Sequence, residues 1–506
     1  MLTLALVPSA SLFGVDGHAV TVEVYSSTGV PSFTVVGLPD ASCREARDRV
    51  RAALGSAGIA WPNKKVIVNL APSMLRKVGS GLDLPIAIGV LVAEGHVAMD
   101  AIHGMAFVGE LGLDGAVRPV PGIVSLVDAV DHPVAVVPRA GAHEAALVGR
   151  HEIRAVANVA DLLAALRGEA EWPDPPPAPP APAVVSPPDL ADVRGQPVAR
   201  FALEVAAAGR HHVLLVGPPG AGKTMLARRL PGLLPRLEAD EALQVTRVHS
   251  AAGLPLPAGG LVQCPPFRAP HHGASAVSLV GGGSGAMRPG EISNAHGGVL
   301  FLDELGEFHT DVLEALRQPL EEGVIRVARA AASVTYPARF LLVAAMNPCP
   351  CGDGGPPGSC RCSDAARARY SRRLSGPLLD RLDLRVEVSR PDVGDLLGGT
   401  GGEPTATVAE RVAAARGRAR ERGVAANADI PPHRLDELAP LGPAATDLLE
   451  VALRTGRLSA RGLKGVRTVA LTIADLQQVD GPVQAEHVAL ALSLRPCVLA
   501  VEQWAA

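Results

Sequence analysis

One glycine-rich segment of eight residues combines the side chains and the backbone freedom that bind phosphate groups. It matches the pattern G-x-x-x-x-G-K-[ST], follows the apolar run His212 to Val216 and precedes a helical run that starts at Met225. Backbone N–H groups of such a loop turn toward phosphate oxygens, its lysine reaches the β- and γ-phosphates, and its hydroxyl ligates Mg2+. The alternative, a purely structural glycine turn, does not explain this strand and helix context. We predict that ATP and Mg2+ bind at Gly217, Pro218, Pro219, Gly220, Ala221, Gly222, Lys223 and Thr224.

Two adjacent carboxylates follow a second apolar run. The run Val299 to Leu302 ends in Asp303 and Glu304. A buried parallel strand delivers the residues at its carboxyl end to the edge where ligands bind. We predict that Asp303 holds Mg2+ and that Glu304 orients the water that attacks the γ-phosphate. A third apolar run ends at Asn347, whose amide could polarise the same water, although an Asn after a strand more often caps a turn.

These three elements, in this order and spacing, resemble the AAA+ ATPases. The resemblance makes Asn347 the sensor 1 residue, Arg381 in the segment 376–383 the arginine finger, and Arg461 the sensor 2 residue, which would touch the γ-phosphate from a helical lid. Two arginines on one phosphate neutralise charge in the transition state, and one of them must come from the next subunit. The resemblance therefore implies an ATP-dependent homo-oligomeric ring, expected to be a hexamer. The alternative for each arginine is a surface salt bridge.

Four cysteines crowd into the Gly- and Pro-rich loop that follows Asn347. Thiolates from the two ends of a short loop can close tetrahedrally on Zn2+, and the metal would replace the core that such a loop cannot form. The other three of the seven cysteines are far apart, which is not the pattern of a secreted disulfide framework. The alternative to a zinc site is four free thiols or a redox disulfide. Because no predicted ligand of ATP lies in this loop, we expect the ATP site to survive loss of the metal. The predicted zinc ligands are Cys349, Cys351, Cys360 and Cys362.

The elements that position these residues belong to a chain of 506 residues, too long for one hydrophobic core. Hydrophobic residues make up 48% and charged residues 19%, so we expect a folded, multi-domain α/β protein rather than a disordered one. Nine prolines between Pro173 and Pro188 favour polyproline II and mark a linker. We predict an N-terminal α/β domain over 1–170, a Pro-rich linker over 171–188, an AAA+ P-loop NTPase core over 189–393, and a C-terminal helical lid domain over 394–506.

Longer strings extend the resemblance over nearly the whole chain, to the magnesium-chelatase-like ATPases of the ComM and YifB type. These strings lie at residues 36–40, 68–72, 83–87, 267–272, 281–283, 288–293 and 295–298. The resemblance implies a hexameric helicase that drives branch migration of DNA in recombination or natural transformation. It also implies pore hairpins at about 252–298 and at 323–338, the second carrying Arg326 and Arg329. Cations on a pore hairpin contact phosphates of DNA without reading its sequence; a solvated charged hairpin is the alternative.

A second basic region follows the cysteines. From Arg361 to Arg385 the chain has seven arginines and three aspartates, a local net charge of +4, although the whole chain carries −4. Together with the cysteine loop, this region could form a surface that faces DNA. Aromatic residues make up only 3% of the chain, which argues against binding of single strands mainly by base stacking.

Two other functions share parts of this pattern. The N-terminal domain looks like the Lon-protease/ribosomal S5-like fold, but Lon-type chemistry needs a serine activated by a lysine. Val124 stands about where the family places that lysine, which leaves only Ser80 with Lys77 as an improvised dyad, so the domain is interpreted as catalytically inert. The motor subunit of magnesium chelatase has a similar ATPase core, but it is not expected to carry the long N-terminal domain or the cysteine cluster.

No segment has the length of a membrane span. The longest apolar stretch, Leu84 to Ala93, contains Pro85 and has half the required length. The amino terminus lacks the basic region of a signal peptide. We therefore expect a cytoplasmic protein without a membrane partner.

Overall fold

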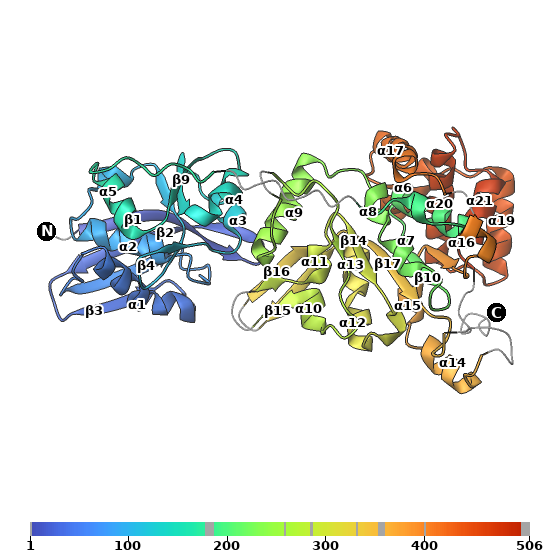
Figure 1. The fold of residues 1–506 in the computed structure, drawn as a ribbon, viewed down its shortest axis with the longest axis horizontal. Helices are drawn as coiled ribbons and strands as arrows, with labels where there is room; N and C mark the ends of the chain where they lie inside the picture. Colours follow the sequence, from blue (N-terminus) through green and yellow to red (C-terminus); the bar gives the residue numbers. More distant parts are fainter. Residues whose placement is uncertain are drawn as a thin grey trace.

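The computed structural model describes residues 3–177, 187–257, 260–283, 287–329, 332–352, 360–398 and 401–496. Three regions follow one another along the long axis of the molecule: an N-terminal α/β region, a central region around a sheet, and a C-terminal helical region (Figure 1). Residues 178–186 of the predicted linker lie outside the described residues. The multi-domain α/β class and the helical C-terminal region are therefore confirmed.

The N-terminal region is built on a four-stranded sheet in the order β1-β2-β4-β3. Buried and partly exposed residues alternate along β2, because one face of the sheet packs on helices. Every residue of α2 is buried, and a Cβ at its Gly89 would lie 2.3 Å from Val24, so this glycine allows the helix to approach the sheet closely. The elements are β1 Thr3–Phe13, β2 Asp16–Ser27, β3 Ser32–Val36, β4 Lys65–Ala71, α1 Ala41–Ser56 and α2 Asp83–Ala93.

A second, parallel sheet completes this region, in the order β5-β8-β9. Its helices include α3, which packs against the central region: the Gly122 N–H donates to the Ser250 carbonyl at 2.9 Å, and Asp128 pairs with Arg247. The N-terminal and central regions are thus in direct contact and are not merely tethered by the linker. The elements are β5 Met105–Phe107, β8 Val134–Pro138, β9 Glu152–Val156, α3 Ile123–Asp128, α4 Ala142–Ala146 and α5 Val159–Leu166.

The central region contains a five-stranded sheet in the order β11-β14-β17-β10-β18, with parallel pairing throughout. Its inner strands are buried along their whole length, as continuous apolar runs are in parallel sheets covered on both faces. The three apolar runs found in the sequence form adjacent strands of this sheet. The strands are β10 Val213–Val216, β11 Phe267–Arg268, β14 Val299–Leu302, β17 Leu341–Met346 and β18 Leu384–Glu387.

Helices and a hairpin surround the sheet. The hairpin of β15 Val324–Arg329 and β16 Ala332–Pro337 packs against the β1–β2 turn through β16, where Val15 shares a buried apolar cluster with Val334 and Tyr336. Nearby, His296 accepts the Arg339 N–H on Nδ1 at 3.0 Å and contacts Gln244 through Nε2 at 2.8 Å. The helices are α6 Pro197–Gly209, α7 Lys223–Ala227, α8 Leu230–Leu233, α9 Ala239–Ala252, α10 Ala276–Val280, α11 Glu291–Asn294, α12 Thr310–Ala315, α13 Arg317–Glu322, α14 Asp364–Ser371 and α15 Gly376–Leu379.

The C-terminal helices share one hydrophobic core with one face of the five-stranded sheet. Asp475, 1% exposed, is paired with Arg418 and Arg422, and His211 at the start of β10 bonds to both Asp383 and Thr472. These buried polar contacts fix the orientation of the helices on the sheet. Among the described helices, none is long and apolar enough to cross a membrane. The helices are α16 Val393–Gly398, α17 Thr405–Glu421, α18 Leu435–Leu438, α19 Pro443–Arg454, α20 Ala460–Leu476 and α21 Ala485–Ser493.

Candidate functional site

The phosphate-binding loop connects β10 to α7, and its glycines have local reasons to be glycine. Gly220 and Gly222 have φ values of +78° and +93°, in the left-handed region that disfavours other residues. At Gly217, a Cβ would lie 2.0 Å from the Val388 carbonyl oxygen, so a side chain would displace β18 from the loop. A Cβ at Gly220 would meet no atom within 4 Å, which leaves the loop open on that side.

The Lys223 ammonium is turned into this loop. Its Nζ donates to the carbonyl oxygens of Gly217 at 2.6 Å and Pro218 at 3.0 Å, and to Asn347 Oδ1 at 3.1 Å. Burial lowers the pKa of Lys223, whereas the carboxylates of Asp303 and Glu304 act in the opposite direction. A phosphate would offer this ammonium a charged acceptor, which is a stronger partner than a neutral carbonyl or amide oxygen.

Asp303, Glu304 and Thr224 meet at the same edge of the sheet. The Thr224 hydroxyl donates to Asp303 Oδ2 at 2.7 Å, and the Glu304 N–H donates to Asp303 Oδ1 at 3.0 Å. Glu304 itself has a φ of +54°, an uncommon conformation for a residue with a side chain. A hydroxyl and a carboxylate in contact are the oxygen donors that Mg2+ prefers, so these side chains fit the predicted metal site.

Strand register explains why these residues assemble. Val216 of β10 pairs with Met346 of β17, so Gly217 and Asn347, the next residue of each strand, emerge side by side. β14 pairs with β17 on its other side and ends one residue before Asp303. The structure therefore brings together the predicted loop, the two carboxylates and Asn347.

His272 belongs to this site, although no motif assigned it a role there. Its Nδ1 lies 3.0 Å from Glu304 Oε2. It follows the two-residue strand β11, which pairs with β14 and so ends at the same edge of the sheet. In the sequence, His271 and His272 stand as adjacent histidines without a third ligand nearby, which gives no signal for contact with a carboxylate about thirty residues away.

Arg381 and Arg461 lie together, away from the phosphate-binding loop. Arg381 Nη2 is 2.5 Å from Glu321 Oε2, and Arg461 pairs with the other oxygen of the same carboxylate. The Arg381 guanidinium holds the pKa of Glu321 below its usual range. Both arginines line a cavity of about 540 Å³ that also includes His212, Phe340 and Asp383.

This arginine cavity lies at the amino ends of the strands. His212, Phe340 and Asp383 each come directly before β10, β17 and β18, whereas the phosphate-binding loop follows β10. A strand of four residues spans about 13 Å. The two arginines are therefore at the opposite edge of the sheet from Lys223 of their own chain.

The basic segments differ in how accessible they are. Arg326 on β15 is exposed and pairs with Glu322 four residues before it; Arg329 ends β15, and its side chain lies outside the described residues. In the segment 361–385, Arg385 is only 6% exposed and Arg381 is engaged by Glu321. The predicted basic surface of seven arginines is consequently smaller than the sequence implies, because Arg385 is buried and the charge of Arg381 is paired with Glu321.

The improvised Ser80 and Lys77 pair is not formed. The Ser80 hydroxyl donates to Glu110, whereas the Lys77 ammonium, which is buried, donates to the carbonyl of Pro72. Neither group bonds to the other, so the Ser80 hydroxyl lacks the lysine that Lon-type chemistry requires.

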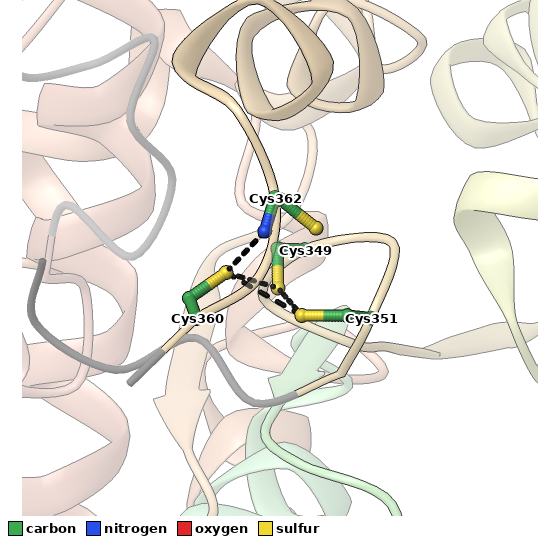
Figure 2. Close-up of side chains that lie close together, drawn as sticks. All are labelled: Cys349, Cys351, Cys360 and Cys362. Atoms are coloured by element: carbon green, nitrogen blue, oxygen red, sulfur yellow. Dashed lines mark hydrogen bonds between the residues drawn. The ribbon is translucent and has the colours of Figure 1, made fainter. Parts of the chain in front are cut away.

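The four clustered cysteines come together in the structure, as Figure 2 shows. All four Sγ atoms lie within 4.8 Å of one another. Cys349 Sγ is 3.3 Å from Cys351 Sγ and 3.5 Å from Cys360 Sγ, and the latter two sulfurs are 3.4 Å apart. No disulfide joins those three sulfurs in the structure, because a disulfide has an S–S distance of about 2.05 Å.

Comparisons with known proteins cover almost the entire chain. Residues 189–396 match the family described as magnesium chelatase, subunit ChlI; residues 22–140 match subunit ChlI of Mg-chelatase, and residues 402–495 match its C-terminal part. An uncharacterized protein of Mycobacterium tuberculosis is 46% identical over 500 residues, which cover 96% of this chain and 97% of that protein. The competence protein ComM of Haemophilus influenzae is 42% identical over 510 residues, or 98% of each chain. The uncharacterized protein YifB of Escherichia coli is 42% identical over 502 residues, 98% of this chain and 97% of that protein.

Proposed function

The chain belongs to the ComM and YifB group of magnesium-chelatase-like AAA+ ATPases, and we propose that it is a ring-forming motor that hydrolyses ATP to drive branch migration of DNA. The ATPase part rests on the residues assembled at the carboxyl edge of the sheet. Lys223 would bind the β- and γ-phosphates, Glu304 would orient the attacking water, and Asn347 would help to polarise it. Mg2+ held by Thr224 and Asp303 would neutralise negative charge on the β- and γ-phosphates.

The observation that supports a ring is the separation of Arg381 and Arg461 from the carboxyl edge of the sheet, where the predicted ATP site lies. Phosphoryl transfer gains about 10³ to 10⁵ in rate from an arginine on the transferring group. Arg381 and Arg461 share Glu321 at the opposite edge of the sheet, where they cannot reach the ATP of their own subunit. A ring supplies each site with both arginines from a neighbour, and closed rotational symmetry leaves no site without them. We propose a hexamer.

Contact with DNA is proposed for the β15–β16 hairpin. The hairpin projects from the central region, and Arg326 on it is exposed. Contacts of this kind bind the phosphate backbone of any sequence, which suits a motor that moves along DNA. The β16 strand of the hairpin contacts the β1–β2 turn, so we propose that the N-terminal region is a Lon-like, S5-like module that supports the hairpin and carries no protease activity.

A branch-migration assay tests this function. The protein, MgATP and a synthetic four-way junction with mobile arms should yield two duplex products, because the motor moves the junction to its end. Glu304→Gln should bind the junction and produce no duplexes, since it lacks the residue that orients water. Unchanged junctions with an active ATPase would contradict the proposed function and favour a chelatase-type motor; degradation of a casein substrate would favour a protease.

A further inference from the structure

The four cysteines have the geometry of a metal site. A tetrahedral Zn2+ with Zn–S bonds of about 2.3 Å requires its sulfurs to be about 3.8 Å apart. The observed separations are 3.3 to 3.5 Å for three pairs and at most 4.8 Å for the rest, which is close enough for four sulfurs to share one ion. Cys349 is 1% exposed, whereas Cys351 lies at the surface, so the cluster is buried on one side and open to solvent on the other.

A cation beside the cluster suits the charge that such a site would carry. Four thiolates around Zn2+ have a net charge of −2. The Arg367 guanidinium, on the helix α14 that follows the last cysteine, lies beside Cys360 and near Cys349. Outer groups of this kind orient the ligands of a metal site and stabilise its charge.

The loop that carries the first two cysteines touches the phosphate-binding loop. Cys349 comes two residues after Asn347, whose side chain accepts a bond from Lys223. Gly352, which closes the turn by donating to the Cys349 carbonyl at 3.0 Å, packs on Pro219: a Cβ at Gly352 would lie 2.6 Å from Pro219 Cδ. The turn and the loop are therefore in van der Waals contact.

The helix α14, which follows the last two cysteines, touches the segment just after Asp303 and Glu304. Tyr370 of α14 lies beside the backbone of Asn347 and packs on Gly306, where a Cβ would lie 2.7 Å from its hydroxyl oxygen. Arg373, just beyond α14, pairs with Glu307 at 3.2 Å. Both ends of the cysteine cluster thus continue into segments that hold the predicted ATP site.

We propose that Cys349, Cys351, Cys360 and Cys362 bind one Zn2+, and that this ion holds the Cys349–Gly352 turn and α14 against the nucleotide site, so that metal occupancy sets the affinity for nucleotide. From the sequence we expect the ATP site to survive loss of the metal, because none of its predicted ligands lies in the cysteine loop. The Gly352–Pro219 and Tyr370–Gly306 contacts change this expectation, because they connect the cysteine cluster to the ATP site without a shared ligand. The coupling rests on the proposed ATP site, whereas the metal site does not.

Metal analysis tests the site by itself. Full-length protein prepared without chelators under reducing conditions should contain about one zinc per chain. Replacement by Co2+ should give the intense thiolate-to-cobalt absorption of a tetrahedral four-sulfur site. Cys360→Ser combined with Cys362→Ser should abolish both signals, and Cys264→Ser, a change at an exposed cysteine outside the cluster, should leave both unchanged. Absence of zinc together with a cobalt spectrum lacking thiolate bands would overturn the metal site.

Binding of a fluorescent ADP analogue tests the coupling without relying on hydrolysis or DNA. Removal of zinc from the native protein by a chelator should raise the Kd for the analogue at least about fivefold, and added zinc should reverse the change. Using the native protein avoids dependence on variants that fail to fold. An unchanged Kd in zinc-free protein would overturn the coupling and leave the metal site standing; no analogue binding by the zinc-loaded protein would contradict the ATP site.

Discussion

Rings assembled from two inactive variants would reveal which subunit supplies Arg461 to each ATP site. Arg461→Ala removes the arginine but keeps Glu304, whereas Glu304→Gln removes the carboxylate but keeps the arginine. Loss of an arginine that contacts the γ-phosphate lowers kcat by roughly 10³-fold or more, so Arg461→Ala alone should be nearly inactive. Glu304→Gln alone should also be nearly inactive, because its water is not oriented.

The structure determines the activity expected of the mixture. Arg461 and Arg381 share Glu321 at the amino edge of the sheet, so both should act on the ATP of a neighbour. An interface is active when an Arg461→Ala subunit provides the pocket and a Glu304→Gln subunit provides the arginines. In a randomly assembled equimolar ring, this arrangement occurs at about one interface in four, and the mixture should recover about one quarter of the native rate.

Phosphate release at constant total protein and varying ratio is the assay. The rate should follow the product of the two subunit fractions and reach its maximum at an equal ratio. Arg454→Ala, a matched change at an exposed arginine of the lid whose partner is Glu450, should be fully active alone. If Arg461 acted within its own subunit, the first mixture would stay inactive, whereas Arg381→Ala mixed with Arg461→Ala would recover about one quarter; that pair of results would refute the placement.

Other substitutions separate the remaining roles. Lys223→Ala should abolish nucleotide binding, whereas Glu304→Gln should keep ATP bound and trap the assembled ring, as equilibrium binding and light scattering would show; normal hydrolysis by Glu304→Gln would exclude its assigned role. Charge reversal at Arg326 and Arg329 should reduce the stimulation of the ATPase by DNA and leave the basal ATPase rate unchanged. Equal stimulation of the variant and the native protein would show that the hairpin does not contact DNA. Burial lowers the pKa of His296 to about 4, so the folded protein loses stability as the pH falls from above 6.5 toward 4. Between pH 7 and pH 5 this histidine should lower the free energy of unfolding by about 2 kcal/mol. The Tm of His296→Gln should therefore fall less over that range than the Tm of the native protein; an equal fall would contradict a neutral, buried His296.

The carboxyl edge of the sheet could be predicted from the sequence because its chemistry is local to strand ends. Each apolar run ends at a residue that could act on phosphate, and parallel pairing brings adjacent strand ends together. The same reasoning cannot find His272, because its strand has only two residues and no apolar run marks it. It also cannot find the Gly352–Pro219 contact, which joins two loops that are more than a hundred residues apart.

The arginines show where sequence reasoning ends. A motif can identify Arg461 as a lid residue, but the direction in which the lid presents it depends on tertiary packing. That packing includes the pairing of Asp475 with Arg418 and Arg422 and the contact of His211 with Thr472, none of which follows from periodicity. The shared partner Glu321 lies 60 residues before Arg381 and 140 before Arg461.

ATPase rates with and without DNA decide whether this protein is a DNA motor. The native protein should be assayed in saturating MgATP alone and with single-stranded, forked and four-way-junction DNA, at two salt concentrations. We expect DNA to raise the rate, and we expect added salt to weaken that stimulation because phosphate contacts release counterions. An ATPase that remains indifferent to all three DNA structures, or a protein that stays monomeric in saturating ATP, would contradict the proposed function.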